Sequence, residues 1–364
     1  MKNKLLLTSA LASSLIAGSS AIAQTTITGD LVVNYRSQSF SSGYDVLSTR
    51  TIGRESQVNI QNKGKLNNGM DYAAGFSLEF DGMGDAGAAA STPGTERNTI
   101  SNENLYIDFI SGNTTFTIGV DHIQRVYGGA VPQVTSVIDD INISGAGTTF
   151  IVGAGTSEAA GVGLTQKIPG AGLSVSAYYV PQAGNPGGYD TGTNPTESGR
   201  NPAYELTVLG TDTFGVKGLT IVGTYNKETK TPGVANSIGS SAANGAGIND
   251  TVGKWYGIGY NFGQIAIGYD HISDVRGAIT STRTEETTNM YGATFAVNKE
   301  LTIGAGYYKT EKEGDADNEK AKYVQIGYNL GPVTAILSAT QVENVGYTAG
   351  KDVDVVTARL STKF

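Results

Sequence analysis

The chain has 364 residues, of which 16% are charged, 50 are Gly, 19 are Tyr and none is Cys. Gly and Tyr are weak helix formers, so this composition disfavours a helical protein, and the lack of Cys excludes disulfides and thiolate metal sites. The net charge of −8 argues against nucleic acid as the main partner.

The first residues have the pattern of an export signal. Two lysines among the first four residues precede a mostly apolar stretch over 5–17, and small residues follow at Ala21 and Ala23. A membrane anchor is the alternative, but the apolar stretch is too short to span a bilayer. The sequence therefore predicts a signal peptide over residues 1–23, export through the Sec pathway and a mature domain over 24–364.

Alternation of apolar and polar residues dominates the mature chain. No later window has 18 consecutive apolar residues, which excludes a bundle of transmembrane helices. In Leu301–Tyr307 the odd positions are apolar and the even positions are small or polar, as in a strand with one apolar face. The predicted strands, in chain order, cover residues 25–37, 50–63, 69–81, 102–111, 114–122, 157–168, 171–181, 202–214, 217–229, 252–262, 263–274, 285–297, 299–311, 320–330, 332–343 and 353–364.

The connections between these strands alternate in kind. Even-numbered strands are followed by short segments rich in Gly and Asn, such as 64–69 and 261–264, which suit hairpin turns. Odd-numbered strands are followed by longer polar segments, such as 82–101 and 182–201. This alternation predicts a sheet whose two ends face different environments.

The physical consequence is a closed sheet in a membrane. Each unpaired backbone group in hydrocarbon costs several kcal/mol, so a sheet there must close on itself. We therefore predict an all-β fold, a transmembrane antiparallel β-barrel of 16 strands, with apolar residues outward, polar residues inward and a water-filled lumen. No inward aromatic track is evident from the alternation. The aromatic residues expected in outward interfacial girdles are Tyr35, Tyr256, Tyr269, Tyr307, Tyr328 and Phe364.

Four segments carry a family resemblance that extends over essentially the whole mature chain. These are the opening strand Thr25–Tyr35, the turn and strand Lys65–Phe76, the hairpin over 102–121 and the terminal Arg359–Phe364. Together with the strand number, they resemble the general diffusion porins of Gram-negative bacteria. The resemblance implies a homotrimer in outer-membrane lipid, and insertion by the barrel-assembly machinery through the last strand and Phe364.

The resemblance also implies that a long third loop, here about 122–156, folds into the barrel as a constriction. Asp139 and Asp140 would then form its acidic side, and Asp121 has inward parity at the end of the fifth strand. Acidic loop groups facing basic wall groups set a field that sorts solutes by charge. The alternative is that Asp139 and Asp140 are ordinary solvated loop carboxylates.

The basic side of such a constriction is less clearly defined. Arg36 has inward parity, whereas Arg54 has outward parity and must lie at the rim, at a subunit contact or beyond a bulge. The resemblance implies inward arginines on the second strand, where this chain has Glu55 and Gln57 instead; Arg125, on a loop, could serve. The acidic balance of the chain favours a mild cation preference.

No motif indicates catalysis or a bound cofactor. The acidic run Asp315–Glu319 lacks the pattern of a calcium loop and is expected to be an exposed loop, and neither His122 nor His271 is oriented for nucleophilic chemistry. We therefore expect no metal, no cofactor and no enzymatic activity. The predicted function is passive diffusion of ions and small hydrophilic solutes. The alternatives are a substrate-selective outer-membrane channel or a secreted soluble all-β adhesin or binding protein.

Overall fold

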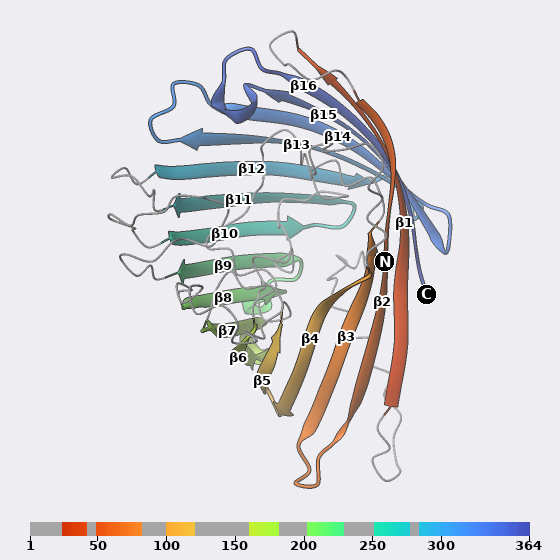
Figure 1. The fold of residues 1–364 in the computed structure, drawn as a ribbon, viewed down its shortest axis with the longest axis vertical. Coiled ribbons are helices and arrows are strands. Elements are labelled where there is room, and N and C mark those ends of the chain that lie inside the picture. The colour runs from red at the N-terminus through yellow and green to blue at the C-terminus, as the bar shows by residue number, and fades with distance from the viewer. Residues whose placement is uncertain are drawn as a thin grey trace, which may run out of the picture.

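The structure, a computed structural model, describes residues 24–41, 49–81, 100–120, 160–181, 202–228, 251–276 and 284–364. Within these residues, sixteen antiparallel strands form one closed barrel (Figure 1). Each strand pairs with its neighbours in the sequence, and β1 closes the barrel by pairing with β16. The strands are β1 Gln24–Phe40, β2 Thr49–Lys65, β3 Asp71–Asp81, β4 Ile100–Ser111, β5 Thr114–Val120, β6 Ala160–Ile168, β7 Leu173–Val180, β8 Ala203–Thr211, β9 Leu219–Glu228, β10 Thr251–Asn261, β11 Ile265–Arg276, β12 Thr284–Ala296, β13 Leu301–Lys312, β14 Glu319–Asn329, β15 Val333–Glu343 and β16 Val353–Lys363.

Each of these strands overlaps one of the predicted ranges, so the strand number and order are confirmed. One departure is at the end of the range 202–214. There Asp212 and Phe214 have positive φ values of 52° and 55°, and a short 3₁₀ turn, η3 (Thr213–Gly215), replaces the last part of the strand. Extended backbone cannot continue through left-handed residues, so the sheet ends at Thr211.

Short turns join the strands at one end of the barrel. In the turn between β14 and β15, Gly331 has a φ of 91°, a value that favours glycine, and its N–H donates to Asn329 Oδ1 at 2.9 Å. The segments between β1 and β2, β3 and β4, β5 and β6, β7 and β8, β9 and β10, and β11 and β12 fall largely outside the described residues, and the expected third loop at about 122–156 lies among them.

The outer face of the barrel is apolar. Outward positions carry large exposed apolar side chains around the ring, for example Leu31 on β1, Leu206 on β8, Ile258 on β10 and Leu337 on β15. In β14 the burial alternates at nearly every residue, with inward side chains buried and outward ones exposed. No helix in the described residues has the length and hydropathy of a membrane-spanning helix. A closed sheet with this surface satisfies its backbone internally and presents apolar side chains to hydrocarbon.

The expected outward aromatic residues lie on this face. Tyr35, Tyr256, Tyr328 and Phe364 are exposed, and the Tyr269 ring is tilted against the Tyr291 ring of the next strand at 5.0 Å between centroids. Rings with an apolar body and a polar edge suit the border between hydrocarbon and headgroups.

Candidate functional site

The inner wall of the barrel is the candidate functional site, because alternate side chains of every strand point toward it. On the seam between β1 and β16, Arg36 is 8% exposed and lies opposite Thr357. Arg359 lies opposite Asn34, at the position diagonal to Arg36 on the same face. Two guanidinium groups therefore occupy neighbouring inward positions at the seam.

Arg359 is a wall residue that the sequence reasoning missed. The alternation in β16 contains the signal, since Val353 and Val355 are buried while Val356 and Leu360 are exposed. Arg359 has the parity of the buried pair.

The inward side chains of β2 to β5 form a polar wall. On β2, Asn59 Nδ2 lies 3.5 Å from Gln57 Oε1, and the next inward residue, Gln61, donates from Nε2 to the Tyr106 hydroxyl on β4. Glu55 lies on β2 opposite Val32 of β1, and its side chain is outside the described part of the chain. Amide and hydroxyl groups thus line this wall where the family resemblance implied arginines.

Hydroxyl and carboxylate groups continue this polar lining around β4 to β8, where the buried apolar pair Val180 and Ala203 interrupts it. Thr117 Oγ1 donates to Asp108 Oδ1 at 2.6 Å, which fixes an inward carboxylate on β4. Glu205 on β8 accepts from Thr207 Oγ1 at 3.0 Å, and the Thr165 and Ser176 hydroxyls are 2.9 Å apart. Groups of this kind replace the hydration shell of a polar solute.

A different surface lines the wall from β9 to β16. Inward side chains there form a buried apolar wall cluster that includes aromatic rings, contrary to the expectation of polar inward residues without an aromatic track. Its members are Val222, Trp255, Ile272, Met290, Tyr308, Ala321, Tyr323, Val342, Val345, Val353 and Val355. Val345 is not on a strand but on the connection after β15, so protein rather than water covers this part of the wall.

One buried carboxylate belongs to this region. Trp255, the single Trp of the chain, donates from Nε1 to Asp270 Oδ1 at 2.8 Å, and Asp270 is fully buried. A buried carboxylate needs such donors, because an unsatisfied one is costly in a low-dielectric environment.

Two residues named in the sequence analysis lie at the outer face of the barrel. Arg54 is exposed on β2 opposite Val33, which agrees with its outward parity. Phe364 exchanges backbone hydrogen bonds with Gly29 at 2.9 and 3.0 Å, and a Cβ at Gly29 would lie 2.6 Å from the Phe364 ring. The terminal ring therefore rests in a space that only a glycine leaves open.

The remaining residues expected at the constriction are not among those that the structure describes. Asp121, Asp139, Asp140 and Arg125 are outside the described residues. In the described part of the chain, His271 stacks on Tyr256 at 4.5 Å between ring centroids, and its Nδ1 lies 2.9 Å from Asn289 Oδ1. The same part contains no group of three or more His, Cys, Asp or Glu residues placed to hold a metal ion.

Comparisons with known proteins match this chain to one family and to several solved structures. A family model described as Gram-negative porin matches residues 8–348. A search of curated proteins found no match. Among solved structures, the anion-selective porin from Comamonas acidovorans is 12% identical with a TM-score of 0.65, over 94% of this chain and 100% of that one.

Two further structures share the fold at similarly low identity. OprB of Pseudomonas putida is 10% identical with a TM-score of 0.61, over 93% of this chain and 94% of that one. The trimer form of OmpT, an outer membrane protein of Vibrio cholerae, is 14% identical with a TM-score of 0.58, over 93% and 99% of the two chains. At these identities the likeness concerns the fold alone.

Proposed function

The chain belongs to the Gram-negative porin family, and on this premise we propose that its outer-membrane channel passes ions and small hydrophilic solutes by passive diffusion. The observation that carries the proposal is the division of the closed sheet into an apolar outer face and an inner wall that is mainly polar from β2 to β8. A barrel of this size leaves an aqueous lumen. A secreted soluble adhesin or binding protein does not fit this division or this family.

A substrate-selective channel is the remaining alternative. Inward aromatic rings would suit it, and Trp255, Tyr308 and Tyr323 are inward. All three are buried beneath other protein groups, however, so they offer no surface to a passing solute. We therefore favour diffusion with little discrimination among small hydrophilic solutes. No chemical turnover and no cofactor is part of this proposal.

Selectivity for cations is the finer part of the proposal. It rests on the net charge of −8 and on inward carboxylates such as Asp108 and Glu205, set against Arg36 and Arg359 at the seam. The Comamonas porin of the same fold is anion-selective, so the fold does not determine the sign of the preference. Charged groups along a narrow channel decide it.

Reconstitution in a planar bilayer tests both parts. We expect stepwise increases of conductance, and a reversal potential of cation-selective sign in a KCl gradient. The absence of unitary steps would refute a pore, whereas steps with a reversal potential of anion-selective sign would refute only the cation preference.

The acidic constriction is proposed to consist of Asp139 and Asp140, with Asp121 at its edge. Arg36, Gln57, Glu55 and Arg125 are proposed as further lining groups. In a double variant Asp139→Asn, Asp140→Asn, the reversal potential should move toward zero. The matched control is the double variant Glu300→Gln, Glu313→Gln, at two exposed acidic residues of described turns, which also removes two charges and should leave the potential unchanged. An equal shift in both variants would mean that net charge, rather than a constriction, sets selectivity.

The assembly is proposed to be a homotrimer in outer-membrane lipid. Support comes from the family and from the trimer form of the Vibrio protein with the same fold. We also propose that residues 1–23 direct Sec export and are removed before Gln24, and that the barrel-assembly machinery recognises the last strand through Phe364. Mass spectrometry of the extracted protein would give both the mature N-terminus and the number of subunits.

A further inference from the structure

The connection between β15 and β16, residues 344–352, has a fixed conformation of its own. Asn344, just before the short turn η4 (Val345–Tyr347), and Tyr347, its last residue, adopt left-handed φ values of 56° and 61°. The Asn344 side chain accepts from the Gly350 N–H at 3.1 Å, and Asp352 Oδ1 accepts from the Asn344 N–H at 3.0 Å. A bulky residue such as Tyr347 holds a positive φ only where surrounding contacts over-determine it.

These surrounding contacts attach the connection to the inner side of the barrel mouth. Val345 is 6% exposed and belongs to the apolar wall cluster. At the β1 side, Ser41 Oγ donates to the Gly350 carbonyl at 2.8 Å. At the other side, Asn344 Nδ2 donates to the Asn318 carbonyl at 3.1 Å. The connection therefore bridges from the end of β1 to the turn before β14.

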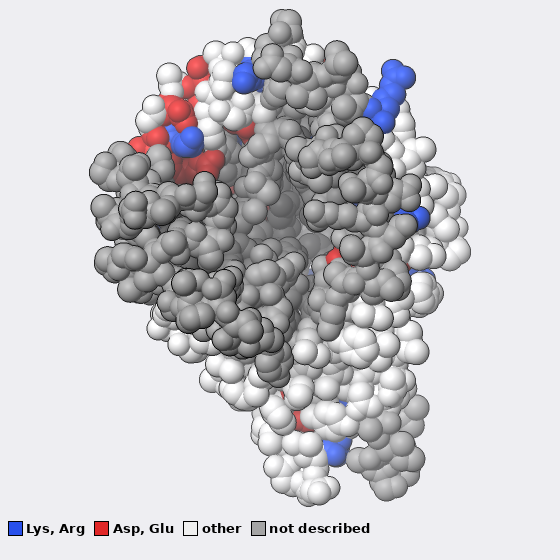
Figure 2. Space-filling view, in the orientation of Figure 1, with Lys and Arg blue, Asp and Glu red and all other residues white. Residues whose placement is uncertain are grey.

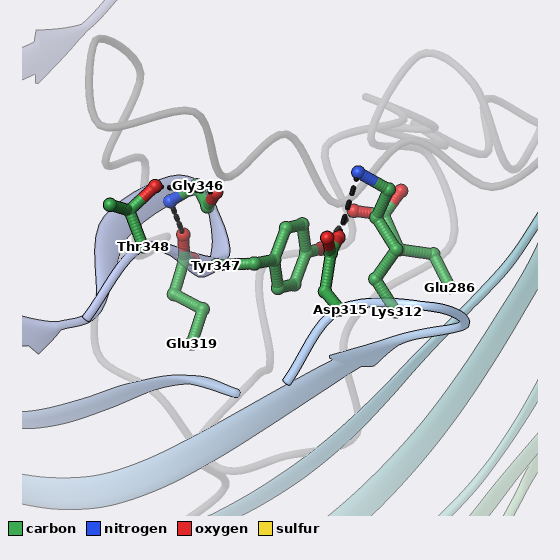
Figure 3. A network of polar contacts seen from close by, with 7 residues as sticks. All are labelled: Glu286, Lys312, Asp315, Glu319, Gly346, Tyr347 and Thr348. Atoms are coloured by element: carbon green, nitrogen blue, oxygen red, sulfur yellow. Dashed lines mark hydrogen bonds and ion pairs between the residues drawn. The ribbon is translucent and has the colours of Figure 1, made fainter. Parts of the chain in front are cut away.

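An aromatic and ionic contact extends the bridge to β12 and β13. Figure 3 shows the Tyr347 ring directed from the connection toward Glu286 and Lys312. The Tyr347 hydroxyl donates to Glu286, and Lys312 Nζ lies 5.0 Å from the ring centroid and 3.0 Å from Asp315 Oδ2. Acidic and basic atoms lie together at the upper left of Figure 2, over the strand ends that Figure 1 labels β12 to β14.

Glu319, the first residue of β14, is the buried anchor of the connection. It is 1% exposed, its Oε2 accepts from the Gly346 N–H at 2.9 Å, and its Oε1 has no hydrogen-bond partner (Figure 3). The sequence predicted an exposed acidic loop over Asp315–Glu319, and for Glu319 this is wrong. The connection, 27 residues further along the chain, covers it.

Glu319 lies at the mouth, outside the part of β14 that faces hydrocarbon. On the outward face of β14, Lys320 and Lys322 come before the first apolar residue, Val324. Burial raises the pKa of the Glu319 carboxyl from 4.5 to about 7; the Gly346 hydrogen bond opposes this rise and the Glu286 carboxylate adds to it.

The titratable surroundings of Glu319 offer it no close cation. Glu286 is the charged group that acts on Glu319, and the other described titratable groups on the surrounding elements are Tyr308, Lys312, Asp315, Asp317, Tyr323, Tyr347, Lys351 and Asp352. Lys312 pairs with Asp315, while Lys309, Lys320 and Glu343 on the same strands have outward parity.

We propose that the connection 344–352 is a latch at the channel mouth, held on the inner wall when Glu319 is protonated and released when Glu319 is ionised. A neutral carboxyl keeps the Gly346 hydrogen bond, because its carbonyl oxygen still accepts. An ionised carboxyl in the same buried position has one oxygen without a donor, and release of the connection gives it water.

The sign of the pH effect follows from linkage. Docking raises the Glu319 pKa, so the docked form binds the proton more tightly and undocking releases it above pH 4.5. The ratio of docked to undocked latch is greatest below pH 4.5. It falls about tenfold per pH unit up to about pH 7, for a total of roughly 300-fold, and is constant above that.

Thiol accessibility measures this ratio even when the undocked form is rare. The chain has no Cys, so single substitutions report without interference. In the full-length folded protein, Val345→Cys places a thiol under the latch and Ala349→Cys places one on its exposed side. Each variant is labelled with a water-soluble methanethiosulfonate. Dividing the labelling rate of Val345→Cys by that of Ala349→Cys cancels the effects of thiol ionisation and reagent decay on the rates.

We expect this rate ratio to rise about tenfold per pH unit between pH 4.5 and 7 and then to level off. Glu319→Gln should hold the ratio at its acid value at every pH, whereas the matched control Glu343→Gln, at the end of β15, should keep the full rise. A flat ratio in the parent chain, or a rise that survives Glu319→Gln, would overturn the proposal.

Trypsin cleavage after Lys351 provides a second reading that does not depend on Val345→Cys folding. At pH 7.5 the native chain should be cut at this bond at least about tenfold faster than Glu319→Gln, because cleavage follows the undocked population. Equal rates would refute the latch. Neither assay uses conductance, so both stand apart from the test of the channel itself.

Discussion

The polar wall of β2 to β5 and the apolar wall cluster of β9 to β16 occupy equivalent inward positions in one sheet. On the polar wall, Tyr106 is half-buried and its hydroxyl accepts from Gln61. In the apolar wall cluster, Tyr308 is fully buried, and Val345 of the β15–β16 connection lies in the same cluster. An inward residue in a barrel can therefore face either water or another part of the protein, and strand alternation does not distinguish the two.

The largest effect should come from the matched tyrosines. Tyr308→Ala should lower the free energy of unfolding by about 3–5 kcal/mol, because it opens a cavity among buried side chains. Tyr106→Ala should lower it by less than half as much, since that ring is partly exposed already. Urea-induced unfolding in detergent micelles would give both values. Equal losses would mean that the two walls are packed alike.

A smaller effect should follow when the buried carboxylate loses a donor. Trp255→Phe keeps an aromatic ring but removes the Nε1 donor of Asp270, and should destabilise the barrel by about 1–3 kcal/mol. The neighbouring outward residue gives the control, since Tyr256→Phe should change the free energy of unfolding by less than about 0.5 kcal/mol. A similar small change in both variants would place Asp270 in contact with water.

The smallest effect belongs to the polar wall. Thr117→Val removes the hydroxyl that donates to Asp108 and should cost about 0.5–1.5 kcal/mol. A double-mutant cycle with Asp108→Ala, which removes the acceptor, isolates the pair, and its coupling free energy should lie in the same range. A coupling above about 3 kcal/mol would show that this wall is as dry as the apolar wall cluster.

The family resemblance and the strand ranges were predictable because they depend on local patterns. Alternation in segments such as Leu301–Tyr307, and Gly- and Asn-rich turns such as that around Gly331, are set by a few adjacent residues. The same alternation of inward and outward positions predicted the opposite orientations of Arg36 and Arg54. Arg359 obeys it too and could have been found.

The burial of Glu319 was not predictable in this way. Its local sequence is an acidic run, which is typical of a solvated loop. What covers it is the connection that supplies the Gly346 N–H, and the fold of this connection depends on Asn344, Gly350 and Asp352. The candidate constriction around Asp139 and Asp140 depends on long-range contacts of the same kind and stays a prediction.

By itself, the sequence determined a closed barrel of sixteen strands with an apolar exterior, because strand period and backbone hydrogen bonding in hydrocarbon act residue by residue. Only the tertiary structure decided which inward side chains are wet and which are covered. That choice is made by contacts between distant segments, such as Ser41 with Gly350 and Glu286 with Tyr347. Such pairings leave no periodic trace in the chain, since they depend on how a loop folds over a wall that the strands have already formed.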